Sequence, residues 1–317
     1  MPVPVLIDTD PGIDDALALC LAFASPEISV EALTTVAGNA PVDLATRNVA
    51  RILSVVRSAR PPLVARGAEK PLARPLVTAA SVHGQDGLGD LPRWRGAPEP
   101  SLALAPMDGA DLILEMARRH RGELLLVALG PLTNLALALE RDPGSLRAVR
   151  RVVVMGGAIA VPGNVTAVAE FNFYVDPHAA ARVVEAGLPL TLVPLDATSQ
   201  AVWSSAAIES LAEAAGPVVG FVRALARRGL ELLRGVGEDG ITLHDPLAVA
   251  AAIDPTLVRL TPLAVAVETD GTLTLGTSVA DRRPGARRAA PTCEVALGVD
   301  RDSFLALFTE RVCRGSP

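Results

Sequence analysis

Cysteine, lysine and aromatic residues are all scarce in this chain of 317 residues, and these scarcities argue against several classes of site and partner. The three cysteines form no CxxC pair and are odd in number, which argues against a disulfide framework and against a zinc knuckle. Aromatic residues make up 3% of the chain, and the arginines are scattered without aromatic residues between them. A surface for nucleic acid normally combines basic clusters with aromatic side chains. We therefore expect no nucleic-acid partner.

Long apolar runs are missing as well. No apolar stretch reaches the roughly 18 to 20 residues that span a bilayer, and Met1–Leu6 lacks the positive start and long apolar run of a secretion signal. We therefore expect no membrane partner and a cytoplasmic location. Half of the residues are hydrophobic, which is enough to bury a substantial core, and the formal net charge of −6 is diffuse.

Short runs of Val, Leu and Ile alternate along the chain with longer Ala- and Leu-rich segments at helical spacing. This alternation is typical of parallel strands joined by helical crossovers. We predict an α/β fold, with an open, mainly parallel, Rossmann-like sheet flanked by helices, in a single domain over residues 1–317. The expected strands are 3–8, 28–37, 124–129, 150–155 and 190–195, and the expected helices are 14–24, 41–58, 108–120, 132–141, 177–186, 205–215, 217–233 and 245–253.

Three segments fall outside this alternation. Residues 265–276 alternate around Asp270 and Gly271, which predicts a small antiparallel hairpin with a tight turn at an edge of the sheet. Residues 66–100 are rich in Gly and Pro and show little periodicity, which predicts a long loop of the kind that often carries function. Residues 235–242 have a similar character and are a candidate flap.

The stretch IDTDPGIDDALAL, residues 7–19, places four aspartates within eight positions at the junction of a predicted strand and a predicted helix. Loops that follow the carboxyl ends of parallel strands are where ligands bind. An aspartate at a helix start also caps the first amides, but capping explains only one or two of the four. Because clustered carboxylates repel one another unless a cation neutralises them, we predict a metal site, with structural capping as the alternative.

The cation should be hard and oxygen-loving, because the acidic loop itself offers carboxylates and neither histidine nor cysteine. Calcium and magnesium both fit these ligands. The spacing departs from an EF-hand loop, since Gly12 occupies a ligand position, so distant segments must complete the site. Asp245 in LHDPLAVA is the obvious contributor, because it also precedes a predicted helix after an irregular loop, and His244 lies beside it.

Several other polar residues follow strand ends in apolar surroundings. They are Asn39 after the second strand, His83 in the Gly-rich loop, and Asn164, Glu170 and Asn172 after a later strand. Taken singly, each asparagine is more typical of a turn. Their shared position after strand ends favours a site, and such hydrogen-bonding groups suit a polyhydroxyl ligand.

Together, the segments DTDPGIDDALAL, TVAGN, VHGQDGLG, ALGPLTNLALAL, MGGA…GN…AEFNFYVDP and LHDPLAVA resemble the nucleoside hydrolases, the inosine-uridine preferring group of calcium-dependent N-ribohydrolases. The resemblance runs from residue 5 to about residue 253 in consistent order and spacing. It implies hydrolysis of a ribonucleoside to ribose and free nucleobase, without a covalent intermediate. It also implies a homodimer or a homotetramer.

The resemblance implies a role for individual residues. The implied ligands of Ca²⁺ are Asp10, both oxygens of Asp15, Asp245 and the backbone carbonyl of Leu129. A water and two ribose hydroxyls would raise the coordination number to about eight, which calcium permits and magnesium does not. Asp10 would be the general base for the attacking water, and His244 the acid for a purine leaving group or, alternatively, a support for the metal site. The implied substrate contacts are Asp14 with the 2′-hydroxyl, Asn172 with the 3′-hydroxyl, Asn164 and Glu170 with the 5′-hydroxyl, Asn39 and Met155 along the ribose, and His83 and Phe171 near the nucleobase.

Base preference stays open, because relatives often carry tyrosines or a glutamine where this chain has Leu232 and Val236. Hydrolysis of an unusual or modified nucleoside is one alternative. A degenerate member that binds calcium and nucleoside without turnover is another. A phosphatase of the haloacid dehalogenase type, suggested by IDTD after a strand, is disfavoured because its catalytic lysine would have to be Lys70 in a Pro-rich loop.

Overall fold

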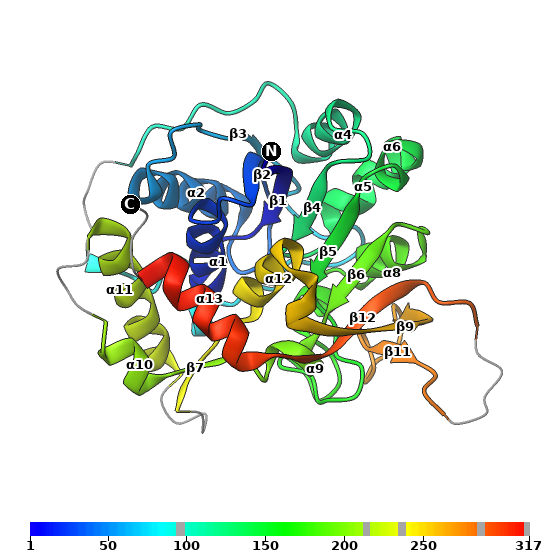
Figure 1. Cartoon of the computed structure of the whole chain (residues 1–317). Helices are drawn as coiled ribbons and strands as arrows, with labels where there is room; N and C mark the ends of the chain where they lie inside the picture. Colours follow the sequence, from blue (N-terminus) through cyan, green and yellow to red (C-terminus); the bar gives the residue numbers. More distant parts are fainter. Residues whose placement is uncertain (93–98, 212–215, 234–238, 284–288, 314–317) are drawn as a thin grey trace.

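The computed structural model describes residues 1–92, 99–211, 216–233, 239–283 and 289–313. Within them, an eight-stranded sheet has the strand order β3-β2-β1-β4-β5-β6-β12-β9 and helices on both faces (Figure 1). Neighbouring strands are parallel except for β12 and β9, which are antiparallel. The predicted α/β fold with a mainly parallel sheet is confirmed. The strands are β1 (Val3–Thr9), β2 (Ile28–Thr35), β3 (Leu63–Arg66), β4 (Leu125–Ala128), β5 (Arg151–Met155), β6 (Leu190–Val193), β9 (Val258–Leu263) and β12 (Cys293–Val299).

Helices connect most of these strands. They are α1 (Ile13–Phe23), α2 (Val42–Val56), α3 (Ala80–His83), α4 (Gly109–Arg119), α5 (Thr133–Arg141), α6 (Pro143–Arg147), α7 (Phe171–Val175), α8 (Pro177–Glu185), α9 (Leu195–Thr198), α10 (Ser205–Glu209), α11 (Pro217–Leu232), α12 (His244–Ile253) and α13 (Arg301–Cys313), with a 3₁₀ helix at Pro255–Leu257. No helix in the described ranges combines the length and the apolar character needed to cross a bilayer.

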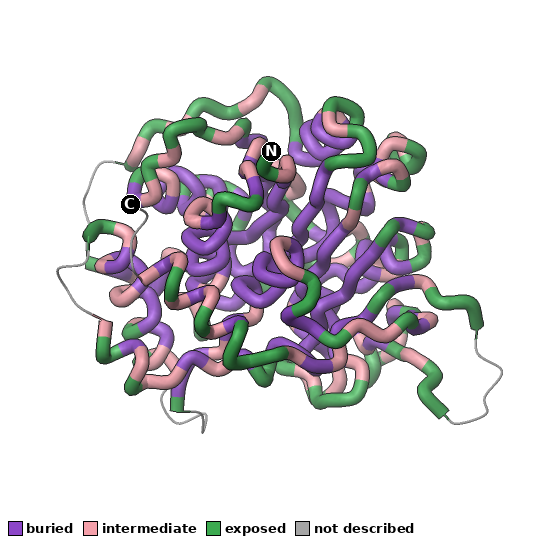
Figure 2. The backbone as a smooth tube through the Cα atoms, viewed as in Figure 1, coloured by how far each residue is buried: buried purple, intermediate pink, exposed green. Residues whose placement is uncertain are grey.

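Buried residues lie on both sides of the sheet, as the colouring of the backbone in Figure 2 shows. Strands β4 and β6 are buried at every residue, as expected for parallel strands that are covered on both faces, and this explains their continuous apolar runs. On one face the core includes side chains of α4, α5 and α8. On the other it includes side chains of α1, α11, α12 and α13.

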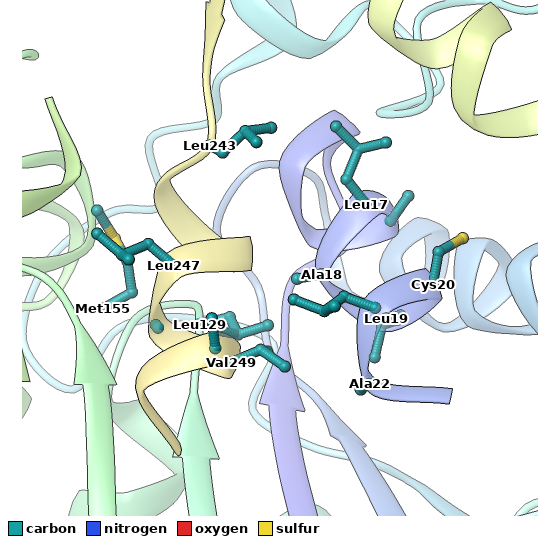
Figure 3. Packing of buried hydrophobic residues seen from close by; sticks show 14 of the residues in the cluster. Leu17, Ala18, Leu19, Cys20, Ala22, Leu129, Met155, Leu243, Leu247 and Val249 are labelled. Carbon is teal, nitrogen blue, oxygen red and sulfur yellow. The ribbon is translucent and has the colours of Figure 1, made fainter. Parts of the chain in front are cut away.

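Helices α1 and α12 are apolar around most of their circumference, so both lie inside the molecule rather than on its surface. They pack side by side, with Leu17 and Leu19 on one helix and Leu247 and Val249 on the other in the same apolar cluster (Figure 3). Each fully buried leucine contributes about 1.5 to 3 kcal/mol of transfer free energy. Because both helices begin at the same edge of the sheet, their packing brings two acidic first turns together.

The five predicted strands are present as β1, β2, β4, β5 and β6, whereas the pattern missed β3, β9, β12 and the helix α13. Strand β3 has only four residues, and β9 contains Pro262 and lies at the sheet edge, where a proline is tolerated. The predicted helix 205–215 is wrong in length: α10 ends at Glu209, and residues 212–215 lie outside the described ranges.

The predicted hairpin exists but is built differently. Strand β10 (Val265–Val267) pairs antiparallel with β11 (Ser278–Ala280), so the returning strand begins after residues 265–276, and the tight turn at Asp270 and Gly271 is wrong. The reason is local: the Glu268 carboxylate accepts hydrogen bonds from both of those backbone amides, which folds the intervening residues into a longer loop. The two strands form a sheet of their own beside the β9 end of the main sheet (Figure 1).

The candidate flap, residues 235–242, falls largely on residues 234–238, which lie outside the described ranges and include Val236. Its last residues form β8 (Gly240–Thr242), which pairs antiparallel with β7 (Val202–Ser204). The predicted loop 66–100 is irregular over most of its described length and contains the short helix α3.

Candidate active site

The carboxyl ends of the parallel strands meet at one edge of the sheet, and a cavity of about 300 Å³ opens there. Its lining includes Asp14, Asn39, His83, Leu129, Met155, Asn164, Glu170, Phe171, Asn172, His244 and Asp245. Asp10 and Asp15 are completely buried beside it. The fold therefore gathers at one place all the site residues that the resemblance implies, although they span residues 10–245.

Three carboxylates at this edge lie close enough to share one cation. Asp14, Asp15 and Asp245 each offer an oxygen atom within 4.8 Å of the others. They come from the first turns of α1 and α12, where the positive ends of the helix dipoles favour negative charge. Asp10, which the resemblance implies as a metal ligand, is not in this tightest group, whereas Asp14, implied as a ribose contact, is.

Asp15 is held from several directions. Its Oδ1 accepts a hydrogen bond from Thr9 Oγ1 at 2.5 Å, and its Oδ2 accepts from Gly12 N at 2.8 Å and from Asn39 Nδ2 at 3.1 Å. Such a network fixes a carboxylate before any ligand arrives. Thr9 has no signal in the sequence, because its role depends on how β1 runs into α1.

Asp10 is arranged differently. Its Oδ2 accepts a hydrogen bond from Asn39 N at 2.6 Å, while its Oδ1 is buried and has no hydrogen-bond partner in the described part of the chain. A Cβ at Gly38 or at Gly130 would overlap the Asp10 carboxylate, so both positions must be glycine for the carboxylate to fit. Asp14 Oδ1 is also buried and has no hydrogen-bond partner among the described residues, although His83 Nδ1 lies 3.9 Å away.

The electrostatics of this cluster are unfavourable without a cation. Burial, and then repulsion from Asp15, raises the pKa of Asp10 well above its ordinary range, and the same two causes raise the pKa of Asp14 to about 7. The pKa of Asp245 is raised by burial and by repulsion from Asp14. Among the described residues that line the cavity, none is an arginine or a lysine. Unpaired buried oxygens together with uncompensated charge fit a divalent cation with oxygen ligands.

Three further lining residues, Glu170, Asn172 and Asn164, are fixed by backbone groups. Glu170 caps α7, accepting from Asn172 N at 2.8 Å and from Gly157 N at 2.9 Å. Asn172 Nδ2 donates to the Leu129 carbonyl at 2.7 Å, so the carbonyl implied as a metal ligand has one protein partner in this structure. Asn164 Oδ1 accepts from Phe171 N at 3.0 Å.

A second cavity of about 450 Å³ adjoins the first and shares Asp14, Val82, His83, Asn164 and His244 with it. The rest of its lining is mainly apolar and includes Ile13, Leu17, Pro162, Leu195, Leu233 and Ile241. Phe171 lines the first cavity and not the second. A polar, acidic chamber therefore leads into an apolar one, with two histidines at the boundary.

The ring nitrogens of these histidines have definite partners. His83 Nδ1 accepts from Ile13 N at 3.1 Å, and His244 Nδ1 lies 2.8 Å from Thr198 Oγ1. Burial lowers the pKa of each histidine to about 4. Both are therefore neutral at pH 7, and each offers one N–H.

Comparison with known proteins agrees with this arrangement. The model of the family described as inosine-uridine preferring nucleoside hydrolase matches residues 5–306. The chain belongs to this family. As a nucleoside hydrolase, it cleaves ribonucleosides to ribose and free nucleobase, which confirms the function inferred from the motifs. The family consists of metal-dependent hydrolases, and the aspartate cluster supplies suitable ligands.

Similar proteins cover this nucleoside hydrolase along its whole length. It is 38% identical over 318 residues to the pyrimidine-specific ribonucleoside hydrolase RihA of Enterobacter sp. strain 638, a match that covers 100% of this chain and 99% of the relative. A plant nucleoside hydrolase superposes with a TM-score of 0.91 at 34% identity, covering 99% of this chain and 100% of that one. The purine-preferring ribonucleoside hydrolase from Gardnerella vaginalis superposes with a TM-score of 0.88 at 30% identity, covering 98% of each chain.

Sequence reasoning assigned no role to three further residues of this nucleoside hydrolase. Asp8 is fully buried, its Oδ1 accepts from Thr34 and Asn134, and burial raises its pKa to about 7. Asp196 accepts from the amides of residues 159 and 160, which anchors the loop that carries Asn164. The third is Thr198, the partner of His244. Asp8 belongs to the visible acidic run, whereas the other two have no signal in the sequence.

Proposed function

We propose that this nucleoside hydrolase uses Ca²⁺ and binds the ribose in the first cavity and the nucleobase in the second. The observation that carries the proposal is the buried carboxylate cluster. Within the described residues it has oxygens without hydrogen-bond partners and no cationic lining residue, and it opens into a chamber lined by asparagines and a glutamate. Polar side chains suit the sugar hydroxyls, and the apolar second chamber suits the flat faces of a base.

Asp10, Asp15, Asp245 and the Leu129 carbonyl are the proposed calcium ligands, with Asp14 beside them. The unpaired Oδ1 of Asp10 and the close approach of Asp15 to Asp245 support this set. All the donors are oxygens, and a site completed by a water and a sugar diol needs more than the six positions of magnesium. When bound, calcium neutralises the carboxylates and lowers the pKa of a coordinated water.

The side chains around the cluster supply the remaining steps. Asp10 is also the proposed base that takes a proton from the attacking water. Asp14 accepts from the 2′-hydroxyl, Asn172 binds the 3′-hydroxyl, and Asn164 with Glu170 contacts the 5′-hydroxyl. Positive charge develops on the sugar as the C1′–N bond breaks, and the surrounding carboxylates stabilise it.

The departing base meets His244 and His83 at the boundary between the cavities. His244 is the proposed hydrogen-bond donor to the leaving group, because in the described part of the chain only its Nδ1 has a protein partner. Asn39 and Met155 line the ribose, and stacking of Phe171 on the base stays a prediction. We also propose a homodimer or homotetramer, which sedimentation velocity would test.

A turnover panel tests the proposal. Metal-stripped enzyme is assayed with uridine, cytidine, inosine and adenosine before and after addition of calcium or magnesium, and release of ribose is measured. We expect calcium to restore turnover of at least one nucleoside. Negligible turnover of all four with calcium would refute the proposal. Binding by calorimetry without release of base would instead indicate a degenerate binding protein.

A further inference from the structure

Thr198, the last residue of α9, contacts His244 inside the protein. This residue is 0% exposed, and its hydroxyl lies 2.8 Å from His244 Nδ1. His244 is the first residue of α12, so the contact joins two elements that are 46 positions apart. The other ring nitrogen, Nε2, is the one left for the two cavities that His244 lines.

The proton of the Thr198 hydroxyl decides how this contact is arranged. In the described part of the chain, His244 Nδ1 is the only polar atom to which the Thr198 side chain is hydrogen-bonded. If Nδ1 carried the proton and donated it, the hydroxyl's own proton would be buried without an acceptor, which is unfavourable. The satisfied arrangement has Thr198 donating to a bare Nδ1. In neutral imidazole the single N–H is then at Nε2.

We propose that Thr198 is a positioning residue, which holds His244 in the tautomer whose Nε2–H donates to the departing nucleobase. This inference rests on the role proposed above for His244. As the C1′–N bond breaks, its electron pair stays on the base, and the Nε2–H hydrogen bond stabilises that negative charge. The proton of the attacking water goes to Asp10, and the released base takes its proton from solvent.

The surroundings of Thr198 keep its hydroxyl in place. Its backbone N–H donates to the Pro194 carbonyl at 3.1 Å, and its carbonyl accepts from Ala201 N at 2.9 Å. Threonine is also stiff at χ1, because two heavy atoms branch from Cβ. A donor fixed in this way selects both the tautomer and the orientation of the histidine ring.

Substitution of Thr198 by valine removes the hydroxyl and keeps the shape. With a nucleoside that the wild type turns over, we expect Thr198→Val to lower kcat about 10- to 100-fold, the usual cost of losing the hydrogen-bond partner of a functional histidine, with KM changed little. With p-nitrophenyl riboside, whose leaving group needs no help, we expect less than about a threefold change. Thr198→Ser should restore nucleoside turnover. Thr191→Val, at a buried threonine of β6, is the matched control.

Nitrogen NMR of the histidine rings tests the tautomer directly, with His244→Gln used to assign the signal. We expect the wild type to show a bare Nδ1 and a protonated Nε2, and Thr198→Val to lose this preference. A proton on Nδ1 in the wild type, an equal loss with both substrates, or no restoration by serine would overturn the inference. Because the NMR measurement on the wild type needs no turnover and does not depend on the valine variant, it separates failure of this inference from failure of the proposed function.

Discussion

Replacing Asp245 by asparagine tests whether the acidic cluster exists for a metal or for helix capping. Asp245 lies within 4.8 Å of both Asp14 and Asp15, measured between carboxylate oxygens. At an effective dielectric constant of about 20, each like-charge pair at this distance costs about 3.5 kcal/mol. Protonation relieves part of this repulsion, and the first turn of α12 loses about 0.3 to 1 kcal/mol of dipole stabilisation. For the metal-free protein, we therefore expect Asp245→Asn to raise the free energy of unfolding by about 1 to 3 kcal/mol.

The assay is thermal unfolding of wild type and variant at pH 8, in a chelator and in millimolar calcium. In the chelator the variant should melt a few degrees higher than the wild type. In calcium the wild type should gain stability by binding, whereas the variant should gain far less. Asp300→Asn, at an exposed aspartate that accepts from Ser303 N, is the matched control and should show neither effect. If the variant is less stable than the wild type in the chelator, and calcium changes neither, the capping interpretation is correct.

The remaining predictions concern catalysis. Asp10→Asn keeps an oxygen that can accept from Asn39 N but removes the base. We therefore expect kcat to fall about 100- to 10,000-fold, with an unchanged circular dichroism spectrum. Near-normal turnover would exclude Asp10 as the base. His244→Ala should reduce hydrolysis of purine nucleosides far more than that of p-nitrophenyl riboside, and an equal reduction would remove His244 from leaving-group departure. Gly130→Ala should abolish turnover and weaken calcium binding measured by calorimetry, because its Cβ would lie 2.5 Å from Asp10 Oδ1. Gly220→Ala, which meets no atom within 4 Å, should leave both unchanged.

Much of the fold was predictable because the central strands are buried on both faces. Strands β4 and β6, for example, have nearly unbroken apolar sequences between helical segments. Strands β9 and β12 were not predictable in this way. Their partners in the sheet are decided by long-range pairing, with β12 inserted between β6 and β9, and their partial exposure breaks the apolar run.

The residues of the candidate site were likewise predictable from the sequence in part only. The acidic run around Asp10 and Asp15 was visible because a strand, a loop and a helix follow one another within a few residues, and the motifs of the other segments were recognisable by resemblance. The contacts of Thr9 and Thr198 were not visible. Their hydroxyls matter only through neighbours that the folded chain supplies, Asp15 in one case and His244 in the other.

By itself, the sequence determined that this protein has a parallel α/β sheet, that four aspartates cluster around the end of its first strand, and that its motifs are those of the nucleoside hydrolases. Only the tertiary structure decided that Asp245 joins Asp14 and Asp15, and which ring nitrogen of His244 faces the cavity. The physical reason is that local patterns fix strands and helices, whereas distances between side chains depend on packing. Here the buried helices α1 and α12 lie side by side on the sheet, and their acidic first turns meet at its edge.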